Sequence, residues 1–221
     1  MALLRVGFIG YEQANALDLA GPAEAFASAL RDTGNGKSER CYEVVIVGLT
    51  KRPFATESGL VFQPSTTTHA APRLDTLIVP GGCGLRRPEV NEKVADWILS
   101  RAKTTRRIAS VCTGIYGLAR TGLLDGRTVT THWRFAADVA RRFPAVKMKS
   151  NALFIKEEKF YTAAGVTAGI DLALALIEED FGPKVALAAA REMVVYLKRS
   201  GGQEQYSEPL QFQTQSGDRF A

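Results

Sequence analysis

The chain has 221 residues, 46% of them hydrophobic, and a formal net charge of +5, so it can bury the core of one large domain without disulfides. Three cysteines and the absence of a secretory signal predict a reducing cytoplasm. The basic residues are too dispersed to indicate direct nucleic-acid binding, and no apolar run reaches the roughly 20 residues that a membrane span requires.

Short apolar runs alternate with amphipathic segments, which predicts an α/β domain with a mostly parallel sheet. In the first half, the expected strands are 3–10, 42–49 and 74–80, and the expected helices are 17–30 and 88–103. Residues 53–65 predict a hairpin that turns at Ser58 and Gly59. Pro22 is placed in the first turn of the first helix, where its missing N–H costs nothing.

The second half continues the alternation. The expected strands are 106–111 and 127–132, the expected helices are 113–124, 133–143, 167–182 and 183–197, and a hairpin is expected over 152–164. Gly182 and Pro183 separate the last two helices. From Lys198 the composition shifts to Gln, Ser, Gly and Glu without a sustained period. We therefore expect a globular domain over 1–197 and a linker over 198–221.

Cys112 lies at the junction between the strand 106–111 and the following helix. Ligands of open α/β sheets bind at the carboxyl ends of the strands, where this junction falls. The positive end of the helix is expected to lower the pKa of the Cys112 thiol from about 8.5 toward about 7, which favours the thiolate. The alternative is a small buried cysteine that fills space.

Two other segments are expected to share this edge of the sheet. The paired glycines of "VPGGCG" let backbone amides approach a ligand closely, so the amide of Gly82 or Cys83 can pair with that of Thr113 in an oxyanion-type nest. Asp18 is either an N-cap or first-turn carboxylate of the first helix, or a proton source and hydrogen-bond partner for Cys112.

Histidine is scarce, because the chain contains only His69 and His132. His69 lies in a loop and is expected to be solvated. His132 ends the strand 127–132 and either lines the crevice or caps that strand. A cysteine hydrolase normally needs a histidine base that a third group orients, and no histidine follows His132. A complete catalytic triad is therefore hard to assemble.

Four segments together resemble the ThiJ/PfpI branch of the class I glutamine amidotransferase-like superfamily: "LDLAGPAEAF", "LIVPGG", "ASVCTGIYGLARTGLLDGRTVTTHW" and "TAAGVTAGIDLALALIEEDFG". The resemblance covers about residues 3–197. It implies a flavodoxin-like three-layer α/β/α sandwich with a mostly parallel central sheet, which is usually dimeric. It also implies a nucleophile-elbow cysteine at Cys112 and an acidic partner at Asp18.

Two groups of proteins share these motifs. One is isocyanide hydratase, which adds water to an isonitrile to give an N-formamide, and the resemblance would assign its cysteine, aspartate and threonine to Cys112, Asp18 and Thr113. The other is the amidase-like amino-terminal domain of AraC-family transcriptional regulators, which a helix-turn-helix DNA-binding domain follows. In PfpI-type peptidases a histidine follows the nucleophile, so Thr113 argues against peptidase activity.

The end of the chain favours the regulator. The segment "AREMVVYLKRSGGQEQYSEPLQFQ" is similar to the one with which such regulators leave the amidase-like domain, and "GDRFA" is similar to the approach to their DNA-binding part. We therefore expect an effector-sensing and dimerisation domain. A small-molecule effector would bind around Cys112, with Gly82, Cys83 and His132 as binding residues, and a homodimer would contact DNA only through an absent C-terminal domain. We expect no cofactor, no metal and no membrane contact.

A third hypothesis is redox sensing. In this hypothesis a Cys112 thiolate is oxidised, and Cys83 resolves the product as a disulfide. The two Cα atoms must then lie within about 7 Å of each other.

Overall fold

A computed structural model describes residues 3–34, 36–199 and 201–204 of the protein. Within these residues, seven strands form the main sheet, in the order β12-β13-β9-β8-β1-β4-β7. Only β12 and β13 pair antiparallel in it; the other neighbours are parallel. The strands are β1 (Leu4–Gly10), β4 (Tyr42–Gly48), β7 (Thr66–Thr67), β8 (Thr76–Val79), β9 (Arg107–Val111), β12 (Phe154–Glu157) and β13 (Phe160–Ala163).

The inner strands have the flavodoxin order. When β1, β4, β8, β9 and β13 are counted from 1 to 5 along the chain, they lie in the sheet as 5-4-3-1-2. β8 and β9 are buried along their whole length, as expected of parallel strands that helices cover on both faces. The predicted α/β fold with a mostly parallel central sheet is confirmed.

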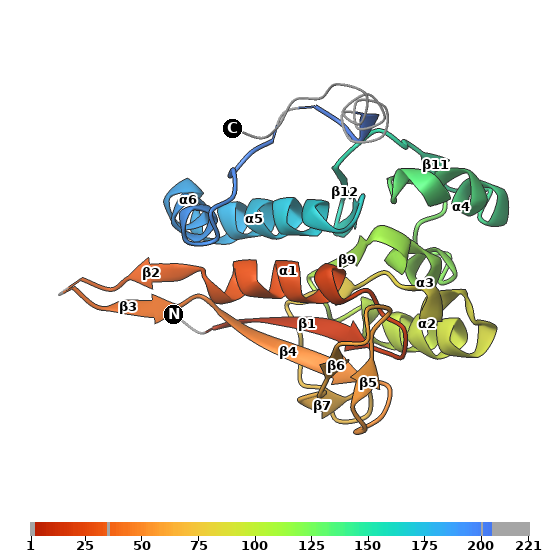
Figure 1. The fold of residues 1–221 in the computed structure, drawn as a ribbon, viewed down its shortest axis with the longest axis horizontal. Coiled ribbons are helices and arrows are strands. Elements are labelled where there is room, and N and C mark those ends of the chain that lie inside the picture. The colour runs from red at the N-terminus through yellow and green to blue at the C-terminus, as the bar shows by residue number, and fades with distance from the viewer. Residues whose placement is uncertain (1–2, 35, 200, 205–221) are drawn as a thin grey trace, which may run out of the picture.

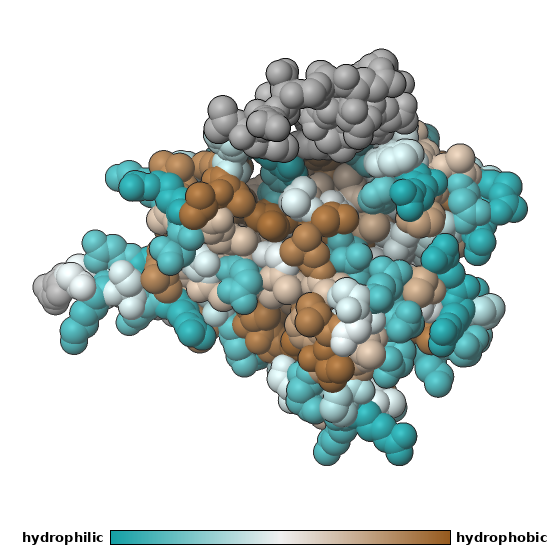
Figure 2. All heavy atoms as spheres, in the orientation of Figure 1, coloured by the Kyte–Doolittle hydropathy of each residue, from teal (hydrophilic) through white to brown (hydrophobic). Residues whose placement is uncertain are grey.

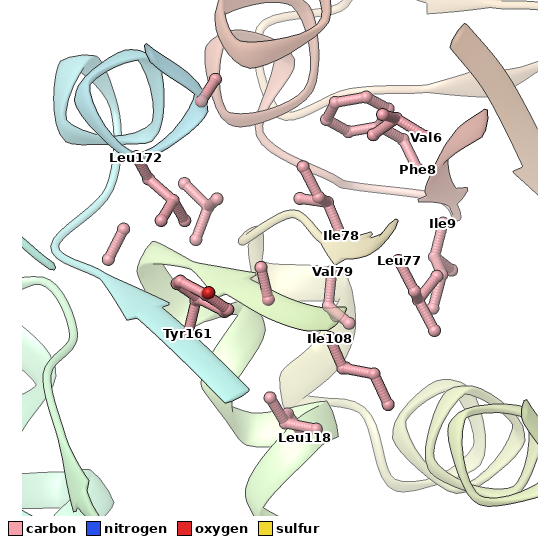
Figure 3. Packing of buried hydrophobic residues seen from close by; sticks show 14 of the residues in the cluster. Val6, Phe8, Ile9, Leu77, Ile78, Val79, Ile108, Leu118, Tyr161 and Leu172 are labelled. Carbon is pink, nitrogen blue, oxygen red and sulfur yellow. The ribbon is translucent and has the colours of Figure 1, made fainter. Parts of the chain in front are cut away.

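Helices cover both faces of the sheet and complete the three-layer sandwich. α1, α5 and α6 pack together on one face, and α2 and α3 pack together on the other (Figure 1). Figure 3 shows apolar side chains on both faces of the sheet. Phe8 of β1 and Leu172 of α5 lie on the face that α1 and α5 cover, and Ile108 of β9 and Leu118 of α3 lie on the face that α2 and α3 cover. The helices are α1 (Ala16–Ala27), α2 (Pro88–Ala102), α3 (Ile115–Ala119), α4 (Ala136–Arg142), α5 (Thr167–Phe181) and α6 (Pro183–Glu192).

Short elements lie outside the main sheet. The hairpin β5–β6 lies where the sequence predicts it, as does the hairpin β12–β13 within the main sheet. The hairpin β2–β3, which projects from the body in Figure 1, was not predicted. These elements are β2 (Leu30–Asp32), β3 (Ser38–Arg40), β5 (Phe54–Ala55), β6 (Val61–Phe62), β10 (Thr128–Val129), β11 (Lys147–Met148) and the 3₁₀ turns η1 (Cys83–Arg86), η2 (Cys112–Gly114) and η3 (Trp133–Phe135).

The helix predicted over 17–30 forms as α1, but the predicted place of Pro22 in its first turn is wrong. α1 begins at Ala16 because the Asn15 side chain caps it and accepts hydrogen bonds from the amides of Leu17 and Asp18. Pro22 therefore lies inside the helix and not in its first turn.

The helix after Cys112 is also shorter than predicted. α3 ends at Ala119 instead of continuing to Leu124. The Thr121 hydroxyl donates to the Leu118 carbonyl, and Gly122 adopts a φ of 74°, so the backbone leaves the helical path. The strand predicted over 127–132 is limited to Thr128–Val129.

α6 ends at Glu192, although a helix to residue 197 was predicted. Val194 adopts a φ of 56°, and the amide of Val195 donates back to the Ala190 carbonyl. This geometry ends the helix as a left-handed glycine usually does. Of the predicted linker 198–221, residues 200 and 205–221 lie outside the described residues.

Candidate functional site

Cys112 follows β9 at the carboxyl edge of the sheet, as predicted, and begins the turn η2. Its φ of 55° lies in the left-handed region that non-glycine residues rarely adopt. Two glycines leave room for the turn: a Cβ on Gly114 would lie 2.0 Å from the Val79 carbonyl oxygen, and one on Gly165 would lie 2.3 Å from the Cys112 Cβ. Backbone packed on both sides therefore holds Cys112 in this conformation.

Asp18 lies in the first turn of α1 but does not cap the helix, because Asn15 does. Its carboxylate is fully buried and accepts hydrogen bonds from the amides of Gly81 (3.0 Å) and Val166 (2.7 Å). These bonds connect α1 to the loops after β8 and β13. The carboxylate also interacts with the Cys112 thiol, so the structure brings together the predicted acidic partner and the cysteine.

Burial dominates the protonation of this pair. It raises the pKa of Asp18 from 3.8 to about 6, although the amides of Val166 and Gly81 and the Cys112 thiol act in the opposite direction. Burial also raises the pKa of Cys112, and the charge of Asp18 raises it further. The Thr113 amide and hydroxyl offset these effects only in part.

The predicted lowering of the Cys112 pKa is therefore wrong. The prediction relied on a long helix behind the cysteine, but α3 has only five residues. The cysteine is 7% exposed, so desolvation of the charged sulfur outweighs the helix dipole. At neutral pH the site holds a thiol.

The amides predicted to form an oxyanion-type nest already donate to side chains. The Gly82 amide donates to the Thr113 hydroxyl at 2.8 Å, and the Cys83 amide donates to the Glu57 carboxylate at 2.7 Å. The structure thus brings Gly82, Cys83 and Thr113 together. However, two of the predicted donors would have to exchange partners before they could bind an oxyanion.

A cavity of about 310 Å³ lies beside Cys112. Its walls include every predicted site residue except Asp18, which is buried behind the wall, and six residues that sequence reasoning missed. The predicted residues in the walls are Gly82, Cys83, Cys112, Thr113 and His132, and the missed ones are Asn15, Glu57, Arg86, Arg134, Phe135 and Val166.

Four of the six missed residues add polar or charged groups to the cavity, and Phe135 and Val166 add apolar surface. Glu57 contributes a carboxylate from the tip of the β5–β6 hairpin, and Arg86 and Arg134 contribute guanidinium groups from two 3₁₀ turns. The lining therefore offers charged and hydrogen-bonding groups beside apolar surface to a small molecule. Arg134 lies only two residues after the predicted binding residue His132, so the sequence could have indicated that Arg134 lines the cavity. No local feature of the sequence marks Glu57 in this way.

His132 lies immediately before η3 and lines the cavity. Its Nδ1 accepts a hydrogen bond from the Arg134 amide at 3.3 Å, and its ring stacks on Trp133 with centroids 5.6 Å apart. Burial and the charge of Arg134 lower the pKa of His132. The residue therefore lines the crevice and caps a turn, but the turn is η3 and not the end of a strand. His69 is exposed, as expected.

Cys83 lines the same cavity as Cys112 and is partly buried. Its thiol donates to the Gln13 side-chain oxygen at 3.6 Å. Both cysteines are free, and their pairing under oxidation remains a prediction.

Three further observations concern the described residues. A larger hollow of about 770 Å³ lies between α1, the β2–β3 hairpin and α6, away from the cysteine. No group of three or more His, Cys, Asp or Glu in the part of the chain that the structure describes is arranged to hold a metal ion. No helix there combines the length and the apolarity needed to cross a bilayer.

The flavodoxin-like sheet and the cysteine at the end of β9 define a class of protein. The chain belongs to the DJ-1/PfpI family, which it matches over residues 4–179.

Its relatives include both an enzyme and regulators. The chain is 36% identical to isonitrile hydratase of Pseudomonas putida over 183 residues, which are 83% of this chain and 75% of that protein. It is 33% identical to the HTH-type transcriptional regulator GbdR of Pseudomonas aeruginosa over 205 residues, which are 93% of this chain and 54% of the regulator. The chain thus spans about half the length of that regulator.

Solved structures include a similar fold. A ThiJ/PfpI family protein from Pseudomonas syringae superposes with a TM-score of 0.73 and 27% sequence identity, covering 90% of this chain and 78% of the other. Homologues of this domain therefore occur in HTH-type regulators, and the predicted family membership is confirmed.

Proposed function

We propose that this domain is the effector-sensing and dimerisation part of a cytoplasmic AraC-family transcriptional regulator. The observation that carries the proposal is the extent of the match to an HTH-type regulator, which includes 93% of this chain but only 54% of the regulator. In the proposed protein, residues 1–197 form the sensing domain, residues 198–221 lead to a helix-turn-helix domain, and only that domain contacts DNA.

The proposed effector site is the cavity beside Cys112. Asn15, Glu57, Arg86 and Arg134 offer hydrogen bonds and charge to a small polar molecule. Cys112 would serve as a ligand contact, because a buried thiol with a raised pKa is a poor nucleophile at neutral pH. An effector changes the state of the regulator only if it binds the two states with different affinity.

The proposed dimer would bury apolar side chains near the start of α1. Leu17, Leu60 and Val61 are exposed, and the Glu57 amide donates to the Ala14 carbonyl, which joins the β5–β6 hairpin to α1. Figure 2 shows apolar surface around this hairpin.

The reading frame downstream of codon 221 tests the regulator proposal. We expect it to continue without a stop codon into a helix-turn-helix domain. A stop codon directly after Ala221 in the native gene would contradict the proposal.

An isocyanide hydratase-like enzyme is the second candidate. The structure brings together Cys112, Asp18 and Thr113, and the chain is 36% identical to an isonitrile hydratase. In this mechanism the Cys112 sulfur bonds to the isonitrile carbon as the S–H bond breaks, and Asp18 accepts the thiol proton and delivers it to that carbon. Water then adds to the thioimidate, the C–S bond breaks, and the N-formamide leaves with the thiol restored.

An assay of formamide production separates the two candidates. The purified chain is incubated with a simple isonitrile, with Cys112→Ala as the control. Turnover above that of Cys112→Ala would support the enzyme, and equal rates would remove it.

A further inference from the structure

The chain after α6 stays in contact with the domain as far as the structure describes it. Lys198 Nζ pairs with Glu178 Oε1 at 2.9 Å, and the Arg199 guanidinium bonds to Asp171 on α5. Further on, the amide of Gln203 donates to the Asn151 carbonyl at 2.8 Å. In Figure 1 this blue segment leaves α6 and runs toward the region of β12.

The Gln203 side chain is the most buried part of this segment, at 4% exposure. Its amide nitrogen lies within hydrogen-bond distance of three backbone carbonyls, and its oxygen accepts from the Trp133 amide at 2.8 Å. Both ends of one side-chain amide are therefore bonded to backbone. The carbonyls are those of Thr131 (2.9 Å), Ser150 (2.6 Å) and Ala152 (3.0 Å).

The backbone that holds Gln203 also forms a wall of the Cys112 cavity. The Thr131 hydroxyl donates to the Cys112 carbonyl at 2.7 Å, while the Thr131 carbonyl accepts from Gln203. His132, which lines the cavity, lies between Thr131 and Trp133, and the backbone of both these neighbours bonds to the Gln203 side chain.

A second contact runs through the loop after β13. Val166 lines the Cys112 cavity and donates its amide to Asp18. Val166 and His132 also line a smaller cavity of about 130 Å³, whose other side includes Arg199 and Gln203. The Cys112 cavity and the segment that contains Arg199 and Gln203 thus share two walls, one formed by residues 131–133 and the other by Val166.

We propose that Gln203 is a positioning residue that fixes the wall of the Cys112 cavity formed by residues 131–133, and couples that cavity to the segment 199–204. Occupation of the cavity and docking of the segment then affect each other equally, because the coupling free energy between two sites is reciprocal. The use of this coupling as a signal to a following domain depends on the proposed function, whereas the positioning role does not.

The rate at which iodoacetamide alkylates Cys112 tests the positioning role. Mass spectrometry of tryptic peptides separates Cys112 from Cys83, and melting temperatures show that each variant is folded. Gln203→Ala removes the bonds to the wall, and we expect Cys112 to react about fivefold faster or more, the lower end of measured couplings. Lys198→Ala is the matched control, because Lys198 directly precedes this segment and pairs with Glu178 away from the cavity. It should leave the rate unchanged.

Hydrogen exchange of the wild-type chain tests the reverse direction without a mutation. Alkylation of Cys112 should accelerate exchange at the amides of Gln203 and Glu204 and leave exchange in α6 unchanged.

A purely structural role predicts a lower melting temperature for Gln203→Ala with unchanged reactivity of Cys112 in the folded protein, and that result would overturn the inference. Unchanged exchange after alkylation would also overturn it. The two proposals can fail separately. If both coupling tests succeed but the native reading frame ends at residue 221, the regulator proposal is refuted and the positioning role of Gln203 stands.

Discussion

The Asp18 carboxyl is completely buried, and its pKa rises from 3.8 to about 6 in the folded protein. Between these two values the folded protein binds more protons than the unfolded chain, so stability falls as pH rises. The difference corresponds to about 3 kcal/mol, present in full below about pH 4 and lost as pH rises through about 6.

Asp18→Asn removes this titration. The quantity to follow is the unfolding free energy of the wild type minus that of Asp18→Asn. We expect this difference to fall by about 3 kcal/mol between pH 4 and pH 7. Urea unfolding at several pH values measures the difference. Asp96→Asn, which removes a carboxylate at an exposed position of α2, is the control. A constant difference for Asp18→Asn would mean that Asp18 does not hold the proton.

Gly165 is one of the two glycines that leave room for the turn at Cys112. Gly165→Ala would place a Cβ 2.3 Å from the Cys112 Cβ at a φ of 109°, so we expect a loss of about 3 kcal/mol or more. Gly126→Ala is the matched control: Gly126 has a φ of 75° but nothing within 4 Å, so only backbone strain of about 1 kcal/mol is expected. Equal losses in urea unfolding would show that the contact with Cys112 contributes nothing.

Among the secondary-structure elements, α6 is followed, two residues after its last residue, by an unusual backbone conformation. Val194 is 91% exposed and has a φ of 56°, a conformation that a β-branched residue adopts at a cost. Val194→Gly should therefore raise the free energy of unfolding by about 1 kcal/mol, as measured by urea unfolding. Ala188→Gly, at an exposed position inside α6, should lower it by about 1 kcal/mol. A loss of stability in Val194→Gly would contradict this account of the helix end.

The alternation of apolar and amphipathic segments was enough to predict the sheet and most of its helices. The helix ends were less predictable, because a few side-chain and backbone bonds decide them. Asn15 moves the start of α1, and Thr121 ends α3 early. The same error affected the chemistry, since a longer α3 was expected to lower the pKa of Cys112.

The motifs around the cysteine predicted the residues that meet at the site, but not its electrostatics. Burial of a thiol and a carboxyl against each other depends on how three loops pack, and spacing along the chain does not show this. Glu57 was missed for the same reason. It reaches the cavity from a hairpin far from Cys112 in sequence and accepts a hydrogen bond from the Cys83 amide, one of the amides predicted to form an oxyanion-type nest.

At the scale of the whole molecule, the proposed dimer makes one prediction. Replacing Leu60 and Val61 together by lysine should shift the protein toward monomer in analytical ultracentrifugation, because apolar area is lost and like charges face each other. Leu99→Lys on α2, an exposed leucine in another element, should leave the assembly unchanged. An unchanged dimer in the double variant would place the interface elsewhere, and a monomeric wild type would refute dimerisation.

The two outer strands of the main sheet are short. β7 pairs with β4 over only two residues, and β12 has four residues, of which Lys156 forms an ion pair with Glu179. A foreign strand could therefore gain few main-chain hydrogen bonds at either margin. This geometry disfavours uncontrolled stacking of copies into fibrils, and any specific assembly must be encoded in side chains, where single substitutions can create or abolish it.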